Sequence, residues 1–143
     1  MIPEFDENGN LPPGIHHATL QEIIERFGVR KSLKRCSLTN NLQDFFSFIK
    51  DYAIGVYVDG SYITSKLAPN DIDLIVILPP DFVFTSEAAR RLQRIQKNKR
   101  NHYLHIFVYA QGVHDQDFHE LIARFTQDRQ GNPKGIIYVE IRQ

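Results

Sequence analysis

The sequence lacks several features that would mark particular classes of protein. Its 143 residues contain a single cysteine, Cys36, which excludes an intrachain disulfide framework and favours a reducing compartment. Because Leu33 and Leu38 lie nearby, we expect this thiol to be partly buried and inert. Basic and acidic residues number 17 each, so no overall charge favours binding to nucleic acid or to an anionic membrane.

Long apolar runs are also missing. No stretch approaches the roughly 20 apolar residues of a membrane-spanning helix, and the acidic start of the chain does not have the charge pattern of a signal peptide. We therefore expect no membrane partner and a cytoplasmic location.

What the chain does contain is typical of one globular domain. Hydrophobic residues make up 42% and charged residues 24% of the sequence, close to the average of folded proteins. Such a length suits a single domain over residues 1–143. Residues 1–15 are rich in turn formers, including Pro12, Pro13 and Gly14, and are expected to form an irregular N-terminal arm.

Hydrophobic spacing then predicts alternating helices and strands. Thr19 and Glu22 have the pattern of a capping box before a helix over residues 19–28. Further helices are predicted over residues 38–52, over residues 86–98 with Thr85 as N-cap, and over residues 118–125 with Asp115 as N-cap. Strands are predicted over residues 54–59, 71–78, 103–110 and 135–141. The sequence thus predicts a mostly two-layer α/β (α+β) fold, in which a mixed sheet of about four strands packs against helices.

The segment between the first two predicted strands carries the clearest chemical signal. Asp71 and Asp73 are two residues apart in a strand, so their side chains are expected on one face. Adjacent carboxylates repel unless a cation lies between them, and Mg²⁺ shared with substrate phosphates is the usual solution. The Gly60-Ser61 turn directly after a strand lets backbone and hydroxyl donors approach phosphate, and Lys66 would add a positive charge.

These residues resemble the DNA polymerase beta-like nucleotidyltransferase superfamily. The resemblance rests on Gly60-Ser61 at a strand end, nine intervening residues, and then Asp71-Ile72-Asp73-Leu74. The longer string that includes Asp59, Thr64, Lys66 and Pro69 is similar to a group of small bacterial proteins related to that superfamily. Similarities at both ends of the chain suggest that the resemblance extends over nearly all of it.

The resemblance implies a nucleotidyltransferase-like sheet and transfer of a nucleoside monophosphate from a nucleoside triphosphate. The acceptor would be a protein, a small molecule or a nucleic-acid end. Asp71 and Asp73 would hold two Mg²⁺ ions, with Mn²⁺ as a possible substitute, while Gly60 and Ser61 would bind phosphates with help from Thr64 and Lys66.

One position departs from the pattern of the superfamily. Active members usually carry a third carboxylate on a later strand, whereas residues 103–108 contain no acid. His105 has the alternation to occupy that place and to accept a proton, although imidazole is a poor ligand for Mg²⁺. The alternative is a half-buried histidine that is hydrogen-bonded within the sheet.

Other interpretations stay open at this level. Asp71 and Asn70 also suit an Asx turn before a strand. Asp59 is either a further ligand or the last exposed residue of its strand, and Lys134 is either an exposed lysine or a phosphate contact from a tight turn. In function, the alternatives are a weak or inactive nucleotide- or metal-binding module, with a protein partner of the toxin and antitoxin kind, and a hydrolase that uses water as acceptor.

Overall fold

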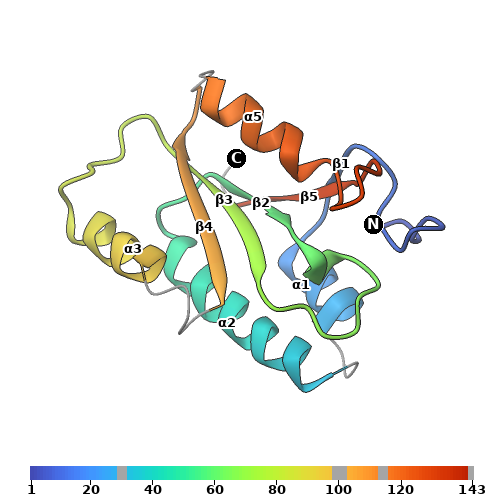
Figure 1. Cartoon of the computed structure of the whole chain (residues 1–143). Coiled ribbons are helices and arrows are strands. Elements are labelled where there is room, and N and C mark those ends of the chain that lie inside the picture. The colour runs from blue at the N-terminus through green and yellow to red at the C-terminus, as the bar shows by residue number, and fades with distance from the viewer. Residues whose placement is uncertain (29–31, 98–102, 113–115, 142–143) are drawn as a thin grey trace.

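The computed structural model describes residues 1–28, 32–97, 103–112 and 116–141, which form a mixed sheet with helices on both faces (Figure 1). Within these ranges the sheet has five strands, in the order β1-β5-β2-β3-β4. They are β1 (Ile15–His17), β2 (Gly55–Asp59), β3 (Ile72–Leu78), β4 (Leu104–Ala110) and β5 (Ile136–Glu140). The central strand β2 is antiparallel to β3 and β5, whereas β4 is parallel to β3 and β1 is parallel to β5. The predicted mixed α+β class is confirmed.

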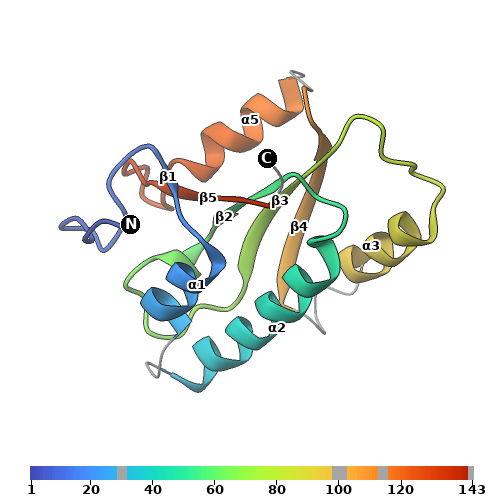
Figure 2. The same cartoon turned by 180° about the vertical axis from the view of Figure 1, so that it is seen from behind.

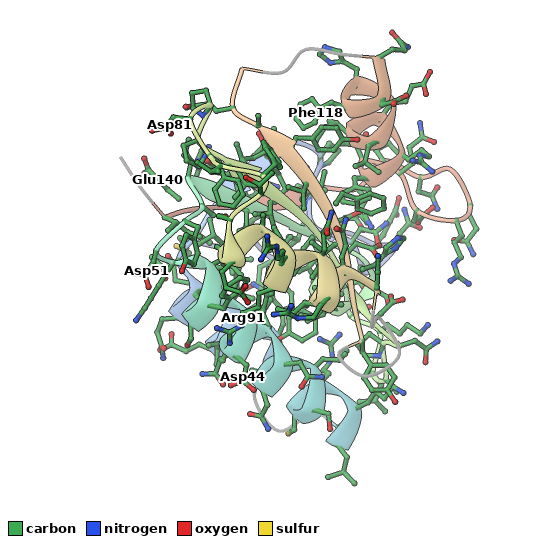
Figure 3. The ribbon with its side chains drawn as sticks, turned by 90° about the vertical axis from the view of Figure 1, so that its left-hand side faces the viewer. Asp44, Asp51, Asp81, Arg91, Phe118 and Glu140 are labelled. Carbon is green, nitrogen blue, oxygen red and sulfur yellow. The ribbon has the colours of Figure 1, made fainter. Side chains whose placement is uncertain are left out.

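The helices divide between the two faces of the sheet. On one face lie α1 (Leu20–Ile23), which continues into a π-helical turn (Ile24–Gly28), α2 (Leu33–Ile49) and α3 (Glu87–Lys97), and on the other lies α5 (Gln116–Phe125) (Figure 2). Figure 3 shows Asp44 and Arg91 on the side of α2 and α3, and Phe118 on the opposite side of the sheet. The expected two-layer arrangement is therefore wrong, because helices cover both faces.

The strand β3 explains why both faces need cover. Its residues alternate between the two faces, and Leu74 and Val76 pack in the cluster beneath α1, α2 and α3. On the other face Ile75 packs in a second cluster with Leu121 and Phe125 of α5. A strand that is apolar on both faces is stable only where both are covered.

Helix α2 buries the face that its sequence predicts. Leu38, Leu42, Phe45, Phe46 and Ile49 are all buried in the larger hydrophobic cluster. This helix begins earlier than predicted, at Leu33, because the Ser32 side chain accepts a hydrogen bond from Arg35 N and caps it.

The N-terminal arm is more ordered than expected. Residues 1–14 have no regular helix or strand, but Ile2 and Leu11 are buried in the hydrophobic cluster. The arm ends one residue earlier than predicted, because β1 begins at Ile15 and pairs with β5. Ile-His-His has no strand-like alternation, so this strand depends on its neighbour.

Several local expectations change in the structure. Ser86, and not Thr85, caps α3, since its hydroxyl accepts from Ala89 N at 3.2 Å. Cys36 is exposed on α2 instead of partly buried. Asp115 lies outside the described residues. In the ranges that are described, no helix has both the length and the apolar character to cross a membrane.

Candidate functional site

The predicted site residues meet in one cleft of about 500 Å³ on the α5 side of the sheet. Its lining includes all seven of them: Gly60, Ser61, Thr64, Lys66, Asp71, Asp73 and His105. The cleft lies where β2 ends and where β3 and β4 begin, because β2 runs antiparallel to β3, and β4 runs parallel to β3. Residues distant in the sequence thereby reach the same edge of the sheet.

The Gly60-Ser61 bend packs directly against one of the two predicted carboxylates. Gly60 has a φ of 94°, a left-handed backbone that glycine adopts without strain. A Cβ atom at this position would lie 3.3 Å from both the backbone nitrogen and Oδ2 of Asp73. The bend therefore requires glycine both for its backbone conformation and for its close approach to Asp73.

A short 3₁₀ turn over Ser61–Ile63 holds the start of the loop. Ile63 N donates to Gly60 O at 3.3 Å, and Thr64 donates from both its backbone nitrogen and its hydroxyl to Ser61 O. The Thr64 hydroxyl lies 2.7 Å from that carbonyl, so Thr64 shapes the loop as well as lining the cleft.

Three polar side chains form a row across the sheet. Asp59 on β2 lies directly opposite Asp73 on β3, and Asp73 lies beside His105 on β4. Paired residues point to the same face, so the row faces α5. His105 Nδ1 is 3.4 Å from Asp73 Oδ1, with 44% of the histidine side chain and 26% of the aspartate side chain exposed. The half-buried histidine thus has a carboxylate partner in the cleft.

Asp59 ends the row in a buried ion pair. Lys134 Nζ lies 2.8 Å from Asp59 Oδ1, and these two side chains are only 8% and 3% exposed. Burial raises the pKa of Asp59 to about 6, Lys134 opposes that rise, and the nearby charge of Asp73 adds to it. Of the two alternatives for each residue, an exposed Lys134 and an exposed Asp59 are both wrong, because the two side chains are buried against each other.

A buried arginine fixes the loop that follows Ser61. Arg35 on α2 is 2% exposed and donates from its guanidinium to the carbonyls of Phe27, Tyr62, Thr64 and Lys66. The Tyr62 hydroxyl also bonds to Thr39 Oγ1 on the same helix, at 2.7 Å. Arg35 therefore links α2 to the backbone of the cleft loop. It also supplies hydrogen-bond donors to carbonyls that are buried or partly buried.

The opposite wall comes from α5, the turn after it and the N-terminal arm. Asn10 Nδ2 donates to Asp128 Oδ2 at 3.0 Å, which joins the arm to this turn. That bond is the main cause of the lowered pKa of Asp128. Arg124, Arg129 and Lys66 line the cleft as exposed cations. The cleft thus combines carboxylates at the sheet with cations around its rim.

The donor set suits a hard divalent ion that is shared with a ligand. Asp71 and Asp73 supply carboxylate oxygens, the ligands that Mg²⁺ prefers. Among the described residues, however, no three His, Cys, Asp or Glu side chains gather closely enough to hold a metal on their own. Mg²⁺ commonly takes one or two carboxylates and completes its shell with phosphates and water, so the residues fit such a shared ion.

Two features of the cleft could not be found from the sequence motif. Arg35 lies before the helix predicted over residues 38–52 and has no acidic residue nearby in the sequence, and Lys134 lies more than seventy residues from Asp59. The weak signals were an aspartate directly before Gly60 and a lysine enclosed by Pro133 and Gly135. Both pairings depend on contacts between distant segments.

Together these features define a mixed α+β protein with a cleft of about 500 Å³ that is acidic at the sheet and basic at the rim. The chain belongs to a family of unknown function, DUF6932, whose pattern matches residues 3–140. Neither the curated proteins nor the solved structures contain a match to this chain.

Proposed function

We propose that the protein is a metal-dependent nucleotidyltransferase of the DNA polymerase beta-like type. It would transfer a nucleoside monophosphate from a nucleoside triphosphate to a protein, a small molecule or a nucleic-acid end. The observation that carries this proposal is the contact between the Gly60-Ser61 bend and Asp73, in a cleft that Asp71 also lines. A phosphate-binding bend and paired carboxylates within one cleft are the parts that such chemistry needs.

The binding roles follow from the positions of the side chains. The Ser61 hydroxyl and backbone N–H groups of the bend would donate to the β- and γ-phosphates, with Thr64 beside them. Lys66, exposed at the rim, would neutralise phosphate charge. Asp71 and Asp73 would hold Mg²⁺ or Mn²⁺, which supplies stabilisation of the negative charge that develops at the α-phosphate and the leaving pyrophosphate.

His105 has the position of a proton acceptor. If its Nδ1–H donates to Asp73, the Nε2 lone pair is available for the proton of the attacking hydroxyl. Asp73 would then orient the imidazole as well as bind the metal. This arrangement would replace the third carboxylate that the superfamily usually has.

The first test is the substitution Asp73→Asn. We expect nucleotide binding in the presence of Mg²⁺ to weaken by at least about 100-fold, because a metal ligand is lost while the shape is kept. Binding of each nucleoside triphosphate would be measured by calorimetry, and transfer with α-labelled nucleotide. Asp44→Asn is the matched control, since Asp44 is exposed on α2 at the opposite face (Figure 3). Unchanged binding in the Asp73→Asn variant would count against the proposal.

A second candidate is a nucleotide-binding module without turnover. It is favoured by His105, which stands on β4 where active members usually have an acid. In that case triphosphates bind with Mg²⁺, but no label moves to any acceptor, and a protein partner of the toxin and antitoxin kind would supply the function. Pyrophosphate release without a labelled acceptor would instead indicate a hydrolase.

A further inference from the structure

The lysine of the buried ion pair is held rigidly in the cleft. Lys134 N donates to Thr126 O at 2.8 Å, and the next residue, Gly135, donates to Leu11 O at 2.9 Å. A Cβ atom at Gly135 would overlap the carbonyl oxygen of Pro12, so the backbone at this point is in close contact with the arm. Because the Lys134 side chain is also only 8% exposed and its Nζ lies 2.8 Å from Asp59 Oδ1, the ammonium is a fixed charge, unlike that of a mobile surface lysine.

That fixed charge is located where two carboxylates oppose each other. Asp59 is directly across from Asp73 in the antiparallel pair, and the charge of Asp73 helps to raise the pKa of Asp59. Two such carboxylates require a counter-charge. For Asp59 the counter-charge is present already, because Lys134 Nζ is 2.8 Å from its Oδ1. A divalent ion bound to the same oxygen would have to lie against the ammonium, and the two positive charges would repel.

The charges around this row match a single divalent ion. Asp59, Asp71 and Asp73 carry three negative charges and Lys134 carries one positive charge, which leaves a net charge of minus two. One Mg²⁺ neutralises the charge of these four side chains, whereas a second would give the same four an excess of positive charge, next to the cations of the rim.

We propose that Lys134 is a built-in cation that takes the position of a second metal beside Asp59, so that the cleft binds one divalent ion, at Asp71 and Asp73. The proposal rests on the proposed function for the identity of the nucleotide ligand. It concerns the number of metal ions and is tested by a count of bound metal that does not depend on catalysis.

The test counts Mn²⁺ bound per chain, by equilibrium dialysis and electron paramagnetic resonance, with and without a non-hydrolysable triphosphate analogue. At about pH 8, where Asp59 is ionised, we expect about one Mn²⁺ per wild-type chain and no Mn²⁺–Mn²⁺ coupling. Lys134→Met removes the ammonium and exposes Asp59 to a second ion, so we expect about two Mn²⁺ per chain with coupling. The matched control, Lys134→Met with Asp59→Asn, lacks both charges and should return to about one.

Each result decides a separate point. Two coupled ions in the wild type, no bound ion under either condition, or the same single ion in wild type and Lys134→Met would overturn the inference. One ion per wild-type chain and a second in Lys134→Met, without any binding of nucleotide, would support the inference while the proposed function fails. If Lys134→Met does not fold, the wild-type count still decides, since two coupled ions are incompatible with the inference.

Discussion

At the scale of single residues, Arg35 connects the interior of the protein to its cleft. Within the described part of the chain its guanidinium makes five hydrogen bonds, all to backbone carbonyls, and three of those carbonyls belong to the loop after Ser61. Burial lowers the pKa of Arg35, but an arginine keeps its charge at neutral pH. A buried charge is costly unless polar groups surround it, and here the carbonyl dipoles of four residues do so.

Arg35→Met should therefore destabilise the protein strongly. The variant leaves several buried carbonyls without donors, and we expect a loss of about 3 kcal/mol or more in the free energy of unfolding. Nucleotide affinity should also fall, because the loop that carries Ser61 and Thr64 loses its support. Urea denaturation measures the first effect and calorimetry the second. The control is Arg91→Met. Arg91 is exposed on α3, where its guanidinium lies 4.6 Å from the centre of the Phe48 ring. This variant should lose less than about 1 kcal/mol in the free energy of unfolding. Equal losses in both variants would contradict the assigned role of Arg35.

At the scale of elements, the start of α3 shows that local sequence does not always identify the N-cap residue of a helix. Both Thr85 and Ser86 are residues that cap helices, and they are adjacent. Only the structure distinguishes them, since the Ser86 hydroxyl reaches Ala89 N and the Ser86 carbonyl accepts from Arg90 N at 3.1 Å. The N-cap of α1 could be assigned to Thr19 from the sequence, because Glu22 completes a reciprocal capping box with it.

Ser86→Ala should cost about 1 kcal/mol of stability, because it removes the acceptor for a backbone donor at the start of α3. Thr85→Ala should change the free energy of unfolding by less than about 0.5 kcal/mol, since its hydroxyl does not cap the helix. Thermal and urea denaturation of both variants would measure this difference. A larger loss of stability in Thr85→Ala than in Ser86→Ala would show that Thr85 is the N-cap residue of α3.

At the scale of the whole molecule, the burial of Asp59 couples the folded state to pH, because burial raises the pKa of Asp59 more than Lys134 lowers it. The folded state raises the pKa of Asp59 from 3.8 to about 6, so the folded protein binds the Asp59 proton more tightly than the unfolded chain does. Stability from this group is fully present below the unfolded pKa and is lost as the pH rises through the folded pKa. Asp59 should therefore lower the free energy of unfolding progressively between about pH 4 and pH 6.

The substitution Asp59→Asn tests this pH dependence. Its side chain has nearly the same shape and does not titrate, so the stability of the wild type relative to this variant should decrease from about pH 4 to about pH 6 and then level off. Urea denaturation across that range gives the difference directly. A difference that stays constant, or that rises with pH, would show that the folded state does not favour the protonated form of Asp59.

The sequence predicts much of the fold because the signals for it are local. The spacing of Leu38, Leu42, Phe45 and Ile49 predicts the buried face of α2, and every one of those residues is buried. The four longer strands were likewise predicted within two residues of their observed ends. The strand β1 was not predicted, since Ile15–His17 has no periodicity and forms a strand by pairing with β5, which is distant in the sequence. The packing of helices on both faces of the sheet was not predicted either. It depends on the face against which α5 packs, and the local sequence does not specify that face.

The candidate site divides in the same way. Gly60-Ser61, Asp71 and Asp73 could be selected from spacing alone, because a turn and an adjacent strand bring them together through contacts near in the chain. His105 could be selected only as one of two readings. The sequence by itself determined which strand carries the two carboxylates and which bend lies beside them. Only the tertiary structure decided that Lys134 neutralises Asp59 and that Arg35 holds the loop, because each contact joins distant segments and becomes favourable only once the surrounding core has excluded water.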